Sequence, residues 1–165
     1  MRSGRRGGSL VEFTLVAIPI IFVVISIFEM SRGMWNYHTL DQAVKVGARY
    51  ASLHGQECTQ DGNNCAATVQ QIAQQIANAA VGLPQNVVVT LTSTTAANKV
   101  QCILSTCLTN NTVWPPTPDN QDGMDIEVSA SYPFRSAISM FWPGSRPMVF
   151  AAGDFPAYSR QTIQY

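Results

Sequence analysis

The chain has 165 residues, with 10 basic and 10 acidic side chains, so its formal net charge is zero. This length suits one domain with one accessory element. No basic patch suggests nucleic-acid binding, and no nucleophile with a matching base stands out. We therefore expect neither a nucleic-acid-binding protein nor an enzyme, and we expect no cofactor and no metal. The apolar residues are unevenly distributed, so the near-zero mean hydropathy conceals a strongly apolar segment.

That apolar segment follows a basic N-terminus. Three arginines precede it, and no charged residue occurs from Phe13 to Phe28. At about 1.5 Å per helical residue, residues 10–30 cross a hydrocarbon layer of roughly 30 Å if Glu12 lies at its edge. The excess of arginine before the segment places the N-terminus in the cytoplasm and the chain from residue 33 onward outside. The sequence therefore predicts a single-pass membrane protein.

A cleaved secretory signal is the alternative explanation of a basic start and an apolar segment. The segment is longer than the usual apolar core of about 7–15 residues, and no small-residue cleavage motif follows it directly. Glu12 is also unexpected, because an acid at the membrane centre costs about 2.5–3.5 kcal/mol. Glu12 is therefore either an interfacial acid of low cost or a residue with a partner inside the membrane.

Residues 5–13 read Arg-Arg-Gly-Gly-Ser-Leu-Val-Glu-Phe. This segment resembles the processing site of type IV pilins, and more closely that of the TadE/TadG-like pseudopilins of tight-adherence (Tad) pili. The resemblance implies that a prepilin peptidase cuts between Gly7 and Gly8, which makes Glu12 the fifth mature residue. A cut after Gly8 would make Glu12 the fourth residue, off the family spacing.

The same resemblance implies a role, partners and a location. Residues 1–7 are the expected leader, and Glu12 with Phe13 is expected to serve assembly, the acid pairing with the freed amine of a neighbouring subunit. A buried acid is tolerated when it is paired. The expected partners are the prepilin peptidase, other pilin subunits, the inner-membrane assembly platform and membrane lipid. The expected location is the bacterial inner membrane, with the C-terminal domain periplasmic or extracellular.

One long helix is expected over residues 8–54, with Pro19 as a candidate kink. Glu29-x-x-Arg32-Gly33 closes the apolar segment, and residues 40–51 resemble the helix extension of the family. Small and apolar residues recur there at steps of three and four, which is typical of one helix face. They are Leu40, Ala43, Val44, Gly47, Ala48 and Ala51. We expect this face to pack on the chain's own domain rather than on another subunit.

Four cysteines occur as two close pairs, Cys58 with Cys65 and Cys102 with Cys107, in the part expected to be exported. An even count in that compartment favours disulfides. Three connectivities are possible, and two local loops are the simplest. A zinc site and free thiols are the alternatives; the spacings are not those of Cys-x-x-Cys, and both histidines lie elsewhere.

Residues 55–165 are expected to form an exported α+β domain with a second helix over 66–81 and a small antiparallel sheet. The pattern predicts a loop over 55–64 and a helix or turn over 135–141. Strands are expected at 86–93, 100–104, Leu108, 124–132, 147–152 and 157–163. The acids Asp119, Asp122, Asp125 and Glu127 lack the calcium-loop pattern, so we expect a solvated face.

The class of protein that fits these expectations is an α+β pseudopilin. By family resemblance the major pilins are very short, so the large domain favours a minor subunit that contributes to assembly or initiation of a Tad-like pilus. One alternative is an exported binding or scaffold domain that stays anchored in the membrane.

Overall fold

A computed structural model describes residues 6–55, 58–60, 63–64, 66–94, 98–134 and 155–164. Within these residues the fold is α+β, as predicted. The helices are α1 (Arg6–Ser52), α2 (Val69–Ala79) and α3 (Leu104–Cys107), and the strands are β1 (Thr59–Gln60), β2 (Asn63–Asn64), β3 (Val88–Ser93), β4 (Lys99–Ile103), β5 (Asp125–Tyr132) and β6 (Phe155–Thr162). One antiparallel sheet has the order β4-β3-β5-β6, and β1 pairs with β2 in a separate hairpin.

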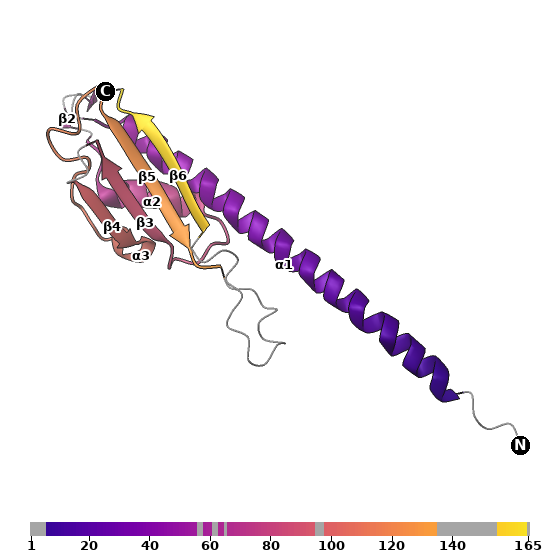
Figure 1. Cartoon of the computed structure of the whole chain (residues 1–165). Coiled ribbons are helices and arrows are strands. Elements are labelled where there is room, and N and C mark those ends of the chain that lie inside the picture. Colours follow the sequence, from indigo (N-terminus) through magenta and orange to yellow (C-terminus); the bar gives the residue numbers. More distant parts are fainter. Residues whose placement is uncertain are drawn as a thin grey trace, which may run out of the picture.

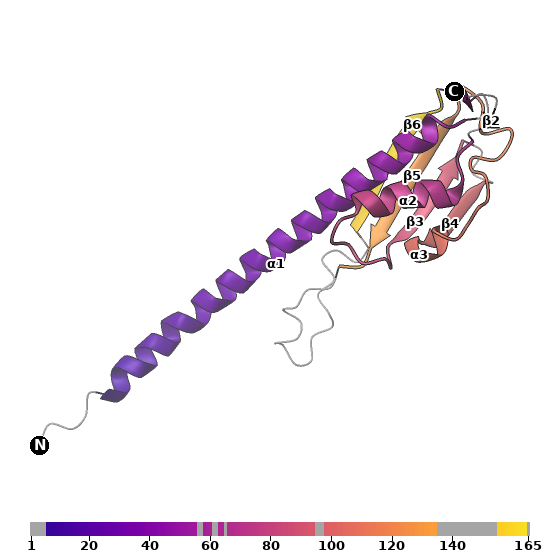
Figure 2. The same cartoon turned by 180° about the vertical axis from the view of Figure 1, so that it is seen from behind.

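Helix α1 is the longest element, with 47 residues, which corresponds to roughly 70 Å. Its C-terminal part lies along the α+β head, and its N-terminal part extends away from it (Figure 1 and, from behind, Figure 2). The helix continues through Pro19, where we expected a candidate kink. A proline removes one backbone hydrogen bond but need not end a long helix.

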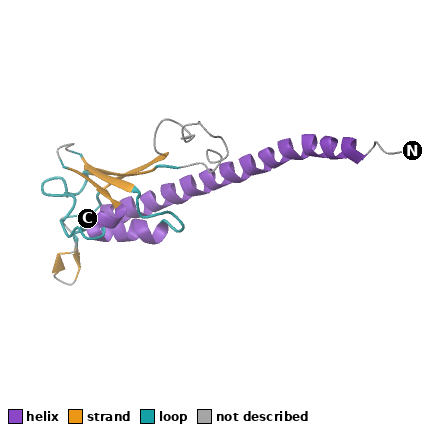
Figure 3. Cartoon of the chain, turned by 90° about the horizontal axis from the view of Figure 1, so that it is seen from below, coloured by secondary structure: helices purple, strands orange, loops and turns teal. Residues whose placement is uncertain are grey.

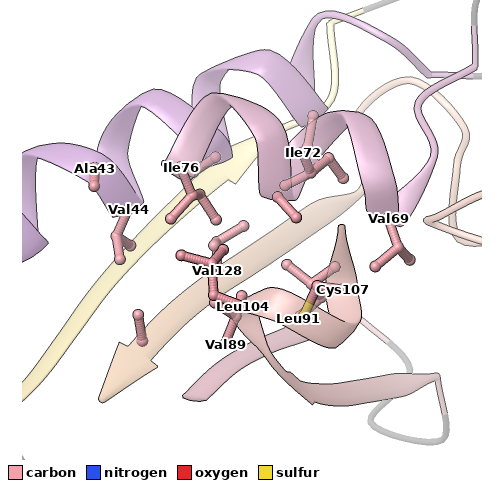
Figure 4. Packing of buried hydrophobic residues seen from close by; sticks show 14 of the residues in the cluster. Ala43, Val44, Val69, Ile72, Ile76, Val89, Leu91, Leu104, Cys107 and Val128 are labelled. Atoms are coloured by element: carbon pink, nitrogen blue, oxygen red, sulfur yellow. The ribbon is translucent and has the colours of Figure 1, made fainter. Parts of the chain in front are cut away.

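Helices α1 and α2 lie on the same face of the four-stranded sheet (Figure 3). Along β3 and β5, buried residues alternate with more exposed ones, so one face of each strand contacts the helices. Val89 and Leu91 of β3 and Val128 of β5 are at most 1% exposed and pack with Ile72 and Ile76 of α2 (Figure 4). The core of the head is therefore a single layer between the sheet and two helices.

The predicted small-residue face of α1 is part of this core. Its residues Leu40, Ala43, Val44, Ala48 and Ala51 are at most 1% exposed. Gly47 lies on the same face, opposite Ile76, and a Cβ added to it would come within 2.5 Å of Ile76 Cγ1. The prediction that this face packs on the chain's own domain is confirmed.

Helix α2 is shorter than the predicted 66–81. Thr68 is its N-cap, and it forms a capping box with Gln71 in which each side chain accepts a hydrogen bond from the other residue's backbone N–H. Ala67 is held outside the helix because its backbone N–H donates to the His54 carbonyl. Beyond Ala80 the chain turns through Gly82, whose φ of +82° favours glycine.

The strand predicted at Leu108 is wrong. Leu104–Cys107 forms the short helix α3, and Leu108 is its C-cap residue. The disulfide between Cys102 and Cys107 gives the reason, because their Cα atoms lie 5.6 Å apart. Five residues of extended strand would separate them by about 17 Å. The chain must therefore reverse between the two cysteines.

The second predicted disulfide, Cys58–Cys65, is only partly covered by the structure. Cys58 is disulfide-bonded, but Cys65 lies outside the described residues, so the pair Cys58–Cys65 stays a prediction. The loop predicted over 55–64 contains the hairpin of β1 and β2. The elements predicted at 135–141 and 147–152 also lie outside the described residues.

Asp119 is an exception to our expectation that the acidic residues form a solvated face. It is fully buried, and its carboxylate accepts hydrogen bonds from the Ser93 hydroxyl and, at 3.0 Å, from the Asn98 amide. Asp122 and Glu127 are exposed, as predicted. In the described parts of the chain, no three potential metal ligands lie together. The buried carboxylate therefore serves to hold the loop after β3 against the loop before β5.

Asp125, the first residue of β5, is held by two side chains of β6. Thr162 Oγ1 donates to one carboxylate oxygen at 2.8 Å, and Arg160 Nη2 donates to the other at 2.7 Å. The hydrogen bond from Thr162, followed by that from Arg160, lowers the pKa of Asp125 below its usual value. The ionised form of Asp125 is thus favoured in the folded chain.

This shift predicts a pH-dependent contribution to stability. A carboxylate with a lowered pKa stabilises the fold above its unfolded pKa of about 4, and this stabilisation is lost as the pH falls through the folded value. Asp125→Asn should lower the unfolding temperature slightly at neutral pH. On acidification, the unfolding temperature of this variant should fall less than that of the wild-type chain. Thermal unfolding of the full chain in detergent micelles, from neutral pH to about pH 2, measures this. The matched control is Asp122→Asn, and a wild-type pH profile for Asp125→Asn would contradict the expectation.

Candidate assembly helix

The N-terminal part of α1 exposes apolar side chains on all its sides. Phe13 and Phe28 are each 72% exposed, and Leu15 is 71% exposed. Soluble monomers rarely expose contiguous apolar patches of more than a few hundred Å². By length and composition, this helix is long and apolar enough to cross a membrane. The segment therefore requires an apolar surrounding, either lipid or other protein.

Hydroxyl groups within this segment are satisfied by the helix itself. The Thr14 hydroxyl donates to the Val11 carbonyl at 3.0 Å, and the Ser26 hydroxyl donates to the Phe22 carbonyl at 2.8 Å. Such local hydrogen bonds leave no unpaired hydroxyl donor facing an apolar surrounding. These two hydroxyl residues are thus compatible with burial in lipid or protein.

The predicted processing and assembly residues all lie in the first turns of α1. The helix begins at Arg6 and therefore runs through Gly7 and Gly8. Glu12 and Phe13 follow less than two turns later, and both side chains are exposed. None of the described residues forms a hydrogen bond or ion pair with Glu12. The structure brings these residues together on one helix end, and their roles remain predictions.

A second polar group lies where the apolar segment meets the head. Glu29 is only 8% exposed, and Arg32 Nη2 lies 2.9 Å from its carboxylate. The Arg32 guanidinium also lies 4.9 Å from the ring centroid of Phe134, just beyond the end of β5. Phe134 in turn contacts α1, since a Cβ on Gly33 would lie 3.7 Å from its ring. This group, which we call the junction, attaches the end of β5 to α1 at the boundary of the apolar segment.

Only part of the junction could be predicted from the amino-acid sequence. The acid–base spacing of Glu29 and Arg32 was visible, because residues three apart on a helix are neighbours. The contribution of Phe134 was missed, because it depends on the sheet bringing a residue about one hundred positions away onto α1.

A long apolar helix thus projects from a small α+β head that packs on its C-terminal part. In the comparison with protein families, the model of the family described as TadE-like protein matches residues 7–49. The resemblance seen in the sequence is thereby confirmed for this N-terminal segment, which is similar to TadE-like proteins. This family is a structural pilus component and not a known enzyme family. No match is found among curated proteins or among solved structures.

Proposed function

We propose that this chain is a minor pilin of a Tad-like pilus that contributes to assembly or initiation of the fibre. The observation that carries the proposal is the exposed apolar half of α1, within the segment that matches the TadE-like family. Such a helix can first lie in the bilayer and then join a bundle of like helices. In both surroundings the apolar side chains are removed from water.

In this proposal the N-terminus is cytoplasmic and the head is exported from the bacterial inner membrane. The prepilin peptidase cuts between Gly7 and Gly8 and removes the basic leader, residues 1–7. The cut creates a new amine at Gly8, four residues before Glu12, on a helix end where Leu10, Val11 and Glu12 are exposed. In the fibre, Glu12 pairs with the amine of a neighbouring subunit and Phe13 packs beside this pair.

The head supports a minor rather than a major role. It contains a core, a sheet of four strands and at least one disulfide, Cys102–Cys107. Disulfides persist in oxidising compartments, which agrees with export of the head. The alternative is an exported binding or scaffold domain whose α1 never leaves the membrane.

The intact mass of the C-terminally tagged chain, expressed with and without a matching prepilin peptidase, tests the proposal. We expect the mass of residues 1–7 to be lost only when the peptidase is present. An unchanged N-terminus in both samples would favour the permanently anchored domain. A cut after residue 30 would indicate a secreted protein and would overturn the pilus assignment.

A further inference from the structure

The first turn of α1 contains the predicted cut site but consists of residues that favour a helix poorly. The helix begins at Arg6, so the peptide bond between Gly7 and Gly8 lies within it. Glycine is less favourable in a helix than any other residue except proline. The turn has no acidic residue, and a positive charge such as that of Arg6 is unfavourable at the positive end of the helix dipole. This turn is therefore intrinsically weaker than the apolar turns that follow it.

The sequence also contains a second helix-start signal, three residues later. Residues 9–12 read Ser-Leu-Val-Glu, the pattern of a capping box in which serine is the N-cap and glutamate is the third helical residue. An apolar segment follows directly, as it does after such a signal. In the structure Ser9 is itself helical, whereas an N-cap residue is not, so the box is not formed there. The chain thus has two alternative starts for α1, one at Arg6 and one after Ser9.

The two starts differ in what they do to the cut site. In a helix that begins at Arg6, the Gly7 carbonyl accepts a hydrogen bond from the backbone N–H four residues later, and the bond to be cut is enclosed in the helix. In a helix with Ser9 as its N-cap, both glycines lie outside the helix and are free to extend. Gly8 tolerates either conformation, because it has no Cβ and no atom lies within 4 Å of the position where one would be.

We propose that the prepilin peptidase cuts the form of the chain in which α1 begins after Ser9, and that Ser9 therefore controls the rate of the cut. The inference rests on the proposed function, since it concerns the cut between Gly7 and Gly8. In this hydrolysis the C–N bond breaks, Gly7 gains the water oxygen as its new carboxylate, and the Gly8 nitrogen takes up the two protons as the new ammonium group. Negative charge develops on the Gly7 carbonyl oxygen, which must leave its helical hydrogen bond to accept donors from the peptidase.

Opening of the first turn then precedes the cut. When a protease acts only on a locally opened form that closes again quickly, the rate of cleavage follows the population of that form. Residues that favour the start after Ser9 should raise the rate, and residues that favour the start at Arg6 should lower it. Only the rate is affected, so a slow variant is still cut completely in time. This holds for Glu12→Ala, which weakens the box.

Substitutions at position 9 of the full chain, in detergent micelles with the purified peptidase, test this inference. Alanine caps a helix poorly, whereas glycine caps it nearly as well as serine, and both lack the hydroxyl group. We expect Ser9→Ala to be cut about fivefold more slowly than the wild-type chain, and Ser9→Gly and Ser9→Asn to be cut at close to the wild-type rate. The readout is the initial rate at which the mass of residues 1–7 is lost.

A second measurement needs no peptidase. In a helix that begins at Arg6, the N–H of Val11 is the donor to the Gly7 carbonyl, and opening of the first turn releases it. Amide hydrogen exchange at Val11 in micelles therefore reports the opened form. Ser9→Ala should slow this exchange about fivefold, the same factor as for the cut, whereas Ser9→Gly should not slow it.

Equal slowing of the cut in Ser9→Ala and Ser9→Gly would show that the peptidase contacts the hydroxyl group directly, and it would overturn the inference. A wild-type rate for Ser9→Ala, or unchanged exchange at Val11 in this variant, would overturn it as well. These results leave the proposed function in place, because the wild-type chain is still cut between Gly7 and Gly8. A wild-type chain that the peptidase does not cut would instead contradict the proposed function.

Discussion

Glu12→Ala is expected to remove nearly all of this subunit from assembled pili while leaving the prepilin peptidase cut intact. The carboxylate is exposed in the isolated chain, near the end of a helix where the neighbouring Leu10, Val11 and Phe13 are apolar. In a helix bundle, the same position would be surrounded by apolar side chains. Removing one partner of a buried ion pair typically costs about 3–5 kcal/mol, because the other charge is left buried and unpaired. The subunit lacking Glu12 should therefore stay in the membrane.

The measurement is the amount of the subunit in sheared pili and in the membrane fraction, with the N-terminus identified by mass spectrometry. Thr14→Ala is a matched control, because it shortens an exposed polar side chain two residues away on the same helix. Glu12→Gln removes the charge but keeps the shape of the side chain. Like Glu12→Ala, it should not enter assembled pili. Normal amounts of Glu12→Ala in pili would sink the proposed role of this residue in subunit register.

Gly47→Ala is expected to destabilise the head, although alanine is ordinarily the better helix residue. The added Cβ would lie 2.5 Å from Ile76 Cγ1 and 2.9 Å from its Cδ1, in a part of the core where Ile76 is fully buried. Overpacking of this kind typically costs about 1–3 kcal/mol, and the gain in helix propensity offsets at most about 1 kcal/mol. We expect a net loss of about 1–2 kcal/mol, measured by denaturant unfolding of the full chain in micelles.

Gly33→Ala is the matched control on the same helix. There a Cβ would meet Phe134 at 3.7 Å, an ordinary contact, so the substitution should be neutral or slightly stabilising. A double-mutant cycle adds a second test, since Gly47→Ala should lose its cost when Ile76 is also replaced by alanine. Equal effects of Gly33→Ala and Gly47→Ala, with no coupling to Ile76, would show that α1 and α2 do not approach as closely as described.

The parts of the fold that could be predicted are those with a local periodic cause. The small-residue face from Leu40 to Ala51 was visible because helix residues three and four apart share a side. Strand β5 was visible because its side chains alternate between two faces. The processing and assembly residues Gly7, Gly8, Glu12 and Phe13 came from family resemblance, and their roles still await experiment.

The predictions that were wrong depend on contacts between residues distant in sequence, or on a change of chain direction imposed by a disulfide bond. The burial of Asp119 depends on Ser93 and Asn98, which the loops bring to it from more than twenty positions away. A single sequence carries no periodic signal for such a contact. The turn at α3 follows from the Cys102–Cys107 bond, whereas valine, isoleucine and leucine in that region favoured strand by composition alone.

Helix α1 is continuous, and its residues between Gly33 and Ala51 pack on the head. The helix therefore links the orientation of the head to that of the N-terminus. An α-helix turns by about 100° and rises about 1.5 Å for each residue. In a fibre, moving the paired carboxylate by one residue along α1 would thus rotate the head by about 100° around the helix axis, while shifting it by only about 1.5 Å along that axis. The pairing of a single carboxylate at one end would set the orientation of the head about the helix axis some 40 residues away, and with it the surface that each subunit presents on the fibre.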